Sequence, residues 1–113
     1  MRRTTGNING ENGQTGALRT FELDASFEVI ERHGGAVLEV DPGGGALTVT
    51  LPDAACGSGF FAEVFMAGTG TITYASTASI VSPGGATQQT TQYSSVRLRR
   101  RGDGSWALEG ALS

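Results

Sequence analysis

The chain has 113 residues, of which 38% are hydrophobic and 18 are glycine, and its formal net charge at pH 7 is −3. This length predicts a single domain with a modest core, and the acidic balance gives no reason to expect nucleic-acid binding. No apolar stretch is long enough for a transmembrane helix, and the N-terminus lacks the apolar region of a signal peptide. The single cysteine, Cys56, excludes a disulfide within the chain.

The first segment, residues 1–17, is predicted to be an N-terminal arm. It is polar and rich in Gly and Asn, and its only large apolar residue after Met1 is Ile8. Such a segment buries too little surface to offset the entropy lost on ordering. We therefore expect either a disordered tail or a segment that becomes ordered on a partner, with Arg2, Arg3 and Ile8 as its contacts.

The segment from Leu18 to Glu31 alternates apolar and polar residues, with Phe21 and Phe27 among its apolar set. This alternation predicts one long strand, or two strands joined by a bend near Asp24. Residues 32–35 are predicted to form a turn, and residues 36–40 the partner strand of a hairpin.

The centre of the predicted fold is residues 43–67. Leu47, Val49 and Leu51 alternate with threonines, which predicts a half-buried strand that ends at Pro52. The return strand has Phe61, Glu63 and Phe65 on one face and Phe60, Ala62, Val64 and Met66 on the other. Because a strand that is apolar on both faces needs cover on both, we expect a subunit interface there. Its predicted residues are Phe60, Val64, Met66 and Trp106.

The remaining strands are predicted at residues 71–75, 79–82, 93–100 and 106–108, with an exposed polar loop at residues 86–92. The Asp-Gly pair in residues 101–105 is typical of a type I′ hairpin turn, which also accounts for the adhesion tripeptide Arg101-Gly-Asp103. Seven to nine short strands with frequent turns and no convincing helix predict an all-β protein. We expect a single antiparallel β-sandwich or flattened barrel over residues 18–113.

Catalytic patterns are absent from the sequence. The only histidine, His33, lies in a predicted turn without metal-ligand spacing, and no phosphate-binding loop is present. We therefore expect no enzyme, no cofactor and no metal site. The one basic cluster includes Arg97, Arg99 and Arg101, which share a strand face. This face is either solvated or a docking patch for an acidic protein surface.

A family resemblance adds to this interpretation. The successive segments ALTVTLPDA, GSGFFAEVFMAGTGTITY, SIVSPGG and YSSVRLRRRGDGSWALEG resemble β-domains of tailed-phage virion proteins. The shared features are a strand ending in Leu-Pro, a Gly-preceded apolar strand, a Gly-Thr-Ile turn and strand, and a final hairpin with Asp-Gly, then Trp and Gly. The resemblance covers residues 44–110. Domains of this kind occur in tail fibres and in small head-decoration (cement) proteins, which are commonly trimers.

The resemblance implies a structural virion protein, made in the host cytoplasm, that binds the major capsid protein on the outer surface of a phage head and stabilises it. A short chain of one domain favours decoration over a fibre. We expect a homotrimer with no nucleic-acid or membrane partner. The alternatives are a tail-fibre or receptor-binding domain, and a carbohydrate-binding module that stacks sugars on Trp106, Tyr74 or Tyr93.

Overall fold

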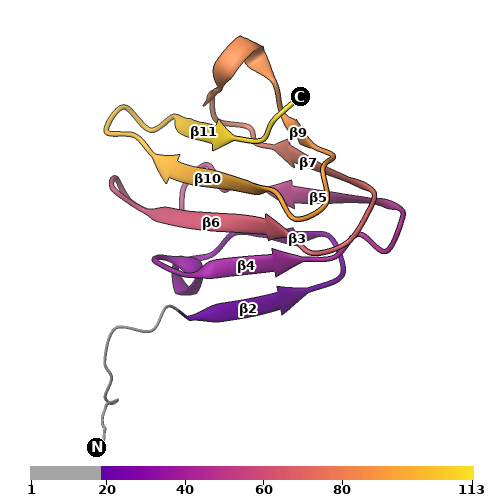
Figure 1. The fold of residues 1–113 in the computed structure, drawn as a ribbon. Helices are drawn as coiled ribbons and strands as arrows, with labels where there is room; N and C mark the ends of the chain where they lie inside the picture. The colour runs from indigo at the N-terminus through magenta and orange to yellow at the C-terminus, as the bar shows by residue number, and fades with distance from the viewer. Residues whose placement is uncertain (1–18) are drawn as a thin grey trace, which may run out of the picture.

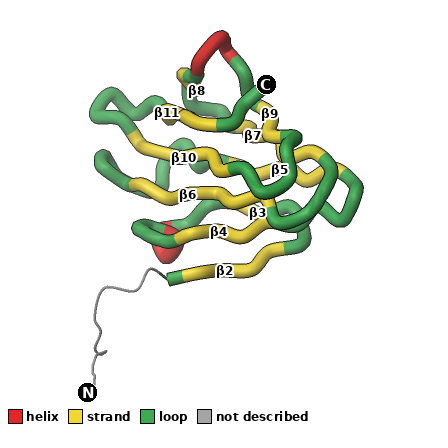
Figure 2. Tube along the Cα trace, viewed as in Figure 1, coloured by secondary structure: helices red, strands yellow, loops and turns green. Residues whose placement is uncertain are grey.

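The computed structural model describes residues 19–113, which form two β-sheets that lie face to face (Figure 1). The six-stranded sheet has the order β2-β4-β6-β10-β11-β8, and the four-stranded sheet has the order β3-β5-β7-β9. Two short 3-10 turns, η1 (Glu31–His33) and η2 (Pro83–Gly85), interrupt the loops between strands (Figure 2). The strands are β2 (Thr20–Leu23), β3 (Phe27–Glu28), β4 (Val37–Val40), β5 (Ala46–Thr50), β6 (Phe61–Met66), β7 (Thr71–Ala75), β8 (Ile80–Val81), β9 (Gln88–Gln89), β10 (Ser95–Arg100) and β11 (Trp106–Gly110).

The chain winds as a β-solenoid. Each turn of the winding, which we call a coil, adds one strand to the six-stranded sheet and then one to the four-stranded sheet. In the six-stranded sheet β2 pairs with β4 and β4 pairs with β6, all in parallel. In the four-stranded sheet β3, β5 and β7 pair in parallel in the same way. The winding ends where β10 pairs antiparallel with both β6 and β11. The described residues therefore form ten strands in two mixed sheets with mostly parallel pairings.

The all-β class is confirmed, but the predicted antiparallel sandwich or barrel is wrong. The predicted hairpin shows why. Thr20 pairs with Val37 in parallel, because between them the chain crosses to the other sheet through β3. The bend near Asp24, given as one alternative, is the point at which the chain leaves the six-stranded sheet. Alternation identifies the faces of a strand but contains no information on the direction of its partner.

The corners of adjacent coils stack through backbone hydrogen bonds. The Gly44 N–H donates to the Thr69 carbonyl at 2.9 Å, and the Thr71 N–H donates to the Gly45 carbonyl at 2.9 Å. Between them Gly70 has φ 124°, and a Cβ there would lie 2.3 Å from the Gly45 carbonyl oxygen. Glycine is therefore required at this corner for the two coils to approach at strand spacing.

The core lies between the two sheets and is built by the inward residue of each alternating pair. Its largest fully buried side chains include Trp106, Leu38, Leu51, Met66, Ile72, Leu98 and Leu108. A polar pair is also buried: the Tyr74 hydroxyl donates to Gln89 Oε1 at 2.7 Å, and burial raises the pKa of Tyr74. Gln89 lies on β9, so the predicted exposed loop at residues 86–92 is wrong at this strand.

Strand β6 lies in the interior of the six-stranded sheet, between β4 and β10, as the sequence predicts. Its two faces also match the prediction. Ala62, Val64 and Met66 are fully buried against the core, whereas Phe61 and Phe65 are on the opposite face. A single chain therefore covers only one of its two apolar faces.

Candidate functional site

The surface with the richest chemistry is the outer face of the six-stranded sheet, which we define as the side turned away from the four-stranded sheet. Pairing registers order its side chains in rows across the strands. Glu63 on β6 lies opposite Arg97 on β10, and Arg97 lies opposite Glu109 on β11. A second row places Phe65 opposite Glu39. The members are Glu22, Glu39, Phe61, Glu63, Phe65, Arg97, Arg99 and Glu109.

Two of the three predicted docking arginines are on this face. Arg97 and Arg99 are exposed, and the guanidinium carbon of Arg97 lies 5.5 Å from the centroid of the Phe61 ring. Phe61 is itself 38% exposed. The Arg97–Phe61 contact is a cation–π interaction. It places a charged group and an apolar ring side by side on neighbouring strands of the sheet. Arg101 follows the last residue of β10 and lines a hollow with Arg99 and Glu109, so it lies at the margin of this face.

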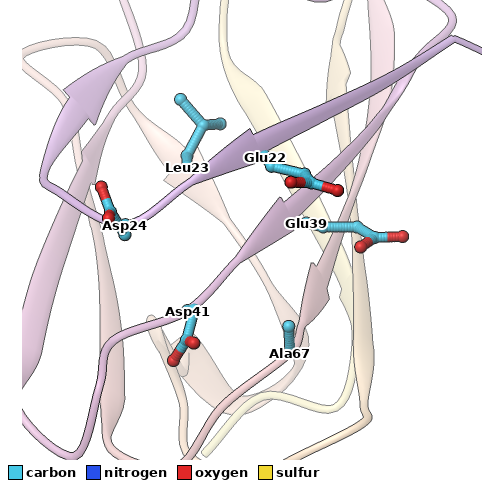
Figure 3. Close-up of a pocket in the computed structure, with 6 residues that line it drawn as sticks. All are labelled: Glu22, Leu23, Asp24, Glu39, Asp41 and Ala67. Carbon is cyan, nitrogen blue, oxygen red and sulfur yellow. The ribbon is translucent and has the colours of Figure 1, made fainter.

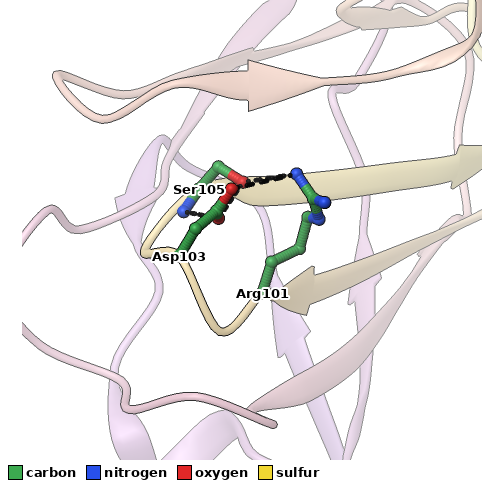
Figure 4. A network of polar contacts seen from close by, with 3 residues as sticks. All are labelled: Arg101, Asp103 and Ser105. Atoms are coloured by element: carbon green, nitrogen blue, oxygen red, sulfur yellow. Dashed lines mark hydrogen bonds and ion pairs between the residues drawn. The ribbon is translucent and has the colours of Figure 1, made fainter.

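Arg101 instead takes part in a network that closes the β10–β11 hairpin (Figure 4). Its Nη1 lies 3.3 Å from Asp103 Oδ2, and the Ser105 hydroxyl and N–H donate to Asp103 Oδ1 at 2.7 and 2.9 Å. These hydrogen bonds from Ser105 lower the pKa of Asp103, and Arg101 adds to the effect. The Asp103 carboxylate is thus engaged inside the turn, which supports a structural role for the tripeptide.

The predicted type I′ geometry of this turn is wrong. A type I′ turn needs positive φ at both central residues, whereas Gly104, at φ 90°, is the residue of the 101–105 turn with positive φ. The Gly104 N–H donates to the Arg101 carbonyl at 3.0 Å, so the four-residue turn begins at Arg101. The positive-φ glycine is therefore the last residue of this turn, after its two central residues, which is typical of a longer hairpin loop.

Sequence reasoning missed Arg100, which is buried. Its guanidinium donates to the carbonyl oxygens of Pro52, Asp53 and Ala55 at 2.7, 2.7 and 3.1 Å. It also lies 5.2 Å from the centroid of the Trp106 ring, whose Nε1 donates to the Pro52 carbonyl at 2.9 Å. The period-2 phase that places Val96 and Leu98 inward also places Arg100 inward, so the signal was present in the sequence.

A stacked aromatic pair joins half-buried Phe65 of the outer face to exposed Tyr93. The rings of Phe65 and Tyr93 stack with centroids 6.3 Å apart and an interplanar angle of 26°. Tyr93 is 68% exposed and has φ 67°, an uncommon conformation for a residue with a side chain. Its N–H donates to the Met66 carbonyl at 2.7 Å, which fixes the turn that carries the ring. Of the three predicted stacking residues, Tyr93 is thus the one on the surface.

The other predicted site residues are in the core. Val64, Met66 and Trp106 are fully buried and Tyr74 is 2% exposed, so these side chains have no surface to offer a second subunit or a sugar. The predicted interface is corrected accordingly. Phe60 is half-buried, with its ring edge-on to Trp106 at 5.7 Å. The predicted arm contacts, Arg2, Arg3 and Ile8, lie outside the described residues.

A hollow of about 360 Å³ opens at the end of β2 (Figure 3). Its lining residues are Glu22, Leu23, Asp24, Glu39, Asp41 and Ala67. Asp41 accepts a hydrogen bond from the Gly43 N–H at 2.8 Å. Within residues 19–113 no group of three or more His, Cys, Asp or Glu residues is arranged to hold a metal ion. The hollow is therefore an acidic surface feature without a metal-ligand arrangement.

His33 and Cys56, the residue types with the most reactive side chains, are both buried. His33 Nδ1 accepts the Ile30 N–H at 3.1 Å, and the ring lies edge-on to Phe21 and Phe27 at 5.1 and 5.8 Å. Burial, with Arg32 and Arg19 nearby, lowers the pKa of His33. Burial likewise raises the pKa of Cys56. A protonated, buried thiol is not an activated nucleophile.

No helix in the described part of the chain is long and apolar enough to cross a membrane. No protein-family model matches the chain, and neither a curated protein nor a solved structure has detectable similarity to it.

Proposed function

We propose that this protein is a structural component of a virus particle, a decoration protein that binds the major capsid protein on the outer surface of a phage head. The resemblance of residues 44–110 to virion β-domains motivates this function. The observation that carries it is the outer face, where exposed Arg97 and Arg99 lie on one rigid strand beside exposed Phe61. Arginine and aromatic side chains are enriched in protein–protein contacts.

The charge pattern of the outer face favours a protein partner over a nucleic acid. Arg97 lies between Glu63 and Glu109 in the pairing register, so this row has mixed sign. A nucleic-acid surface would need an extended basic stripe to neutralise phosphates. A row of mixed charge with exposed arginines instead suits a protein surface that carries carboxylates. The guanidinium group forms bidentate hydrogen bonds with a carboxylate.

The arm and the trimer remain predictions. Removing residues 2–16 is expected to leave a folded domain with weaker capsid affinity, because Arg2, Arg3 and Ile8 would no longer contact the shell. The homotrimer is a prediction for the protein assembled on the shell. It would use Phe61 and Phe65 on the outer face, because the other apolar face of β6, with Val64 and Met66, lies in the core.

The experiment is a count of this chain in purified particles of the virus that encodes it, by quantitative mass spectrometry against the major capsid protein. A decoration protein is expected at hundreds of copies per particle. A handful of copies would identify a fibre component instead, and absence from particles would refute the proposal.

A receptor-binding role is the second candidate, and one observation favours it. Exposed Tyr93 stacks on half-buried Phe65, which lies beside Glu39, and sugars bind where an aromatic ring adjoins polar side chains. A glycan-array screen of the wild type and Tyr93→Ala discriminates the two roles. Binding that disappears in Tyr93→Ala would favour the receptor role, and no binding to any glycan would count against it.

A further inference from the structure

The first coil of the solenoid ends in an open sheet edge at β2. On its inner side the Val37 and Asp41 N–H groups donate to the Arg19 and Leu23 carbonyls, both at 2.9 Å. In a parallel ladder every second residue bonds to the same neighbour, so the N–H and C=O groups of Thr20 and Glu22 point away from β4. No strand within residues 19–113 pairs with that side of β2.

The other sheet edges are blunted, whereas β2 is not. Strands β3, β8 and β9 are each two residues long. Pro83 follows β8 closely, and β9 exchanges hydrogen bonds with Ser113 near the C-terminus. Short strands, proline and covering segments are the usual protections of an edge. Strand β2 has four residues and no proline, and no segment within residues 19–113 pairs with its outer edge.

The end coil is also incompletely covered. Phe21, Leu23 and Phe27 are half-buried in the first coil, although each packs against the core cluster. End repeats of a solenoid need a cap, because each repeat buries its apolar face on its neighbours. The free edge and these side chains therefore require the same occupant, one that adds a strand to β2.

The charged residues at the two ends of β2 indicate which kind of strand would fit this edge. Exposed Arg19 and Arg32 lie at the start of β2, each 5.7 Å from the centroid of the Phe21 ring. The end of β2 carries Glu22 and Asp24, in the acidic hollow of Figure 3. The ion pair found within residues 19–113 joins Arg101 to Asp103, so it uses neither group. An edge that is basic at one end and acidic at the other is complementary to itself when reversed.

We propose that two copies of this chain associate through their β2 edges, antiparallel across a two-fold axis, so that the six-stranded sheets become continuous. Such an interface is isologous, with the same surface on both copies. The basic start of each β2 then lies against the acidic end of the other.

The backbone and side chains specify one register. Thr20 of one copy lies opposite Glu22 of the other, because these residues carry the free N–H and C=O groups and point to the same side of the sheet. This register places the two Phe21 side chains opposite each other on the core side. A shift of two residues along β2 would oppose the two Glu22 carboxylates, which repel.

The register is tested by disulfide trapping in the full chain. Thr20→Cys/Glu22→Cys places cysteines opposite each other twice per dimer, with Cα atoms about 5.5 Å apart, within disulfide range. Both residues are exposed and native Cys56 is buried, so the fold is retained and Cys56 does not compete. Mild oxidation should give a covalent dimer. The single variants Thr20→Cys and Glu22→Cys should give little, because their cysteines lie opposite Glu22 and Thr20. Equal trapping in all three would overturn the register.

The association itself is tested by sedimentation of the full chain. We expect twice the monomer mass of 11.6 kDa, weakened by added salt. Glu22→Pro removes an N–H that β4 does not use, so melting should be retained while the dimer dissociation constant rises about tenfold or more. Glu22→Gln, the matched control, keeps the N–H. For the free chain in solution, a monomer at all concentrations, a trimer, or a dimer unchanged by a folded Glu22→Pro variant would overturn the proposal.

Discussion

Replacing Arg100 by methionine should loosen the loop after β5 and lower the stability of the whole domain. The Arg100 guanidinium donates to the carbonyl oxygens of Pro52, Asp53 and Ala55, whereas Pro52 also receives the Trp106 Nε1 hydrogen bond. Methionine has similar length and keeps the apolar packing, but it has no donor. All three carbonyls therefore lose the guanidinium, but only those of Asp53 and Ala55 lose it without keeping the Trp106 donor that Pro52 retains.

The magnitude follows from these contacts. A hydrogen bond to a charged group contributes about 1.5–3 kcal/mol, so two such losses amount to about 3–6 kcal/mol. Removing a buried charge and burying an apolar side chain returns about 1–2 kcal/mol. From the midpoints of these ranges we expect a net loss of about 3 kcal/mol of unfolding free energy. For a domain of this size that corresponds to a melting temperature lower by roughly 10–20 °C.

The assay combines urea unfolding with thiol labelling of the native protein. Arg99→Met is the matched control, because Arg99 is the exposed neighbour on the same strand. The Cys56 thiol is buried in the same loop, so its labelling should accelerate in Arg100→Met and stay slow in Arg99→Met. Equal stability and equal labelling in the two variants would show that Arg100 does not anchor the loop.

Three further changes test other parts of the structure. Because the pKa of His33 is lowered in the fold, the unfolded chain binds more protons below pH 6.5, and stability should fall as pH drops through that value. Urea titrations at pH 7.5 and 5.5 should show the fall in wild type and a smaller one in His33→Asn; the same slope in both would exclude His33. Gly70→Ala should cost several kcal/mol, since its Cβ would lie 2.3 Å from the Gly45 carbonyl oxygen, and calorimetry that finds it as stable as wild type would contradict the stacked corner. Asp103→Asn should leave melting and particle binding intact, because an amide oxygen still accepts the Ser105 hydrogen bonds; a folded variant that no longer attaches would make the carboxylate functional.

Sequence patterns predicted strands and faces well and strand partners poorly. The faces of β6 follow from alternation, and its central place follows from an apolar residue at nearly every position. The parallel pairing of β2 with β4 could not be derived in this way. Parallel pairing depends on where the chain travels between the strands, and here the two-residue strand β3 redirects it to the other sheet.

The sequence predicted a member of the candidate site only where the residue type and its strand face were enough to place the side chain on the surface. Arg97 and Arg99 follow from period-2 spacing along β10, whereas the strand ends before Arg101, whose guanidinium pairs with Asp103 in the hairpin turn. The Phe65–Tyr93 stack joins residues that are far apart in the sequence, and it depends on a positive φ at Tyr93 that no local pattern indicates. The acidic end of β2 likewise combines two coils, through the pairing of Glu22 with Glu39.

The claim that the outer face attaches this protein to a phage head is tested most directly by titration onto undecorated heads. Wild type and Arg97→Gln/Arg99→Gln are added over the same concentration range, and bound copies are counted per particle. Both arginines are exposed, and glutamine places no like charge between Glu63 and Glu109, so the melting temperatures of the two proteins should nearly agree. We predict that wild type saturates at hundreds of copies and that the variant binds far fewer at equal concentration. Equal occupancy by the two proteins, or no binding of wild type, would contradict the account.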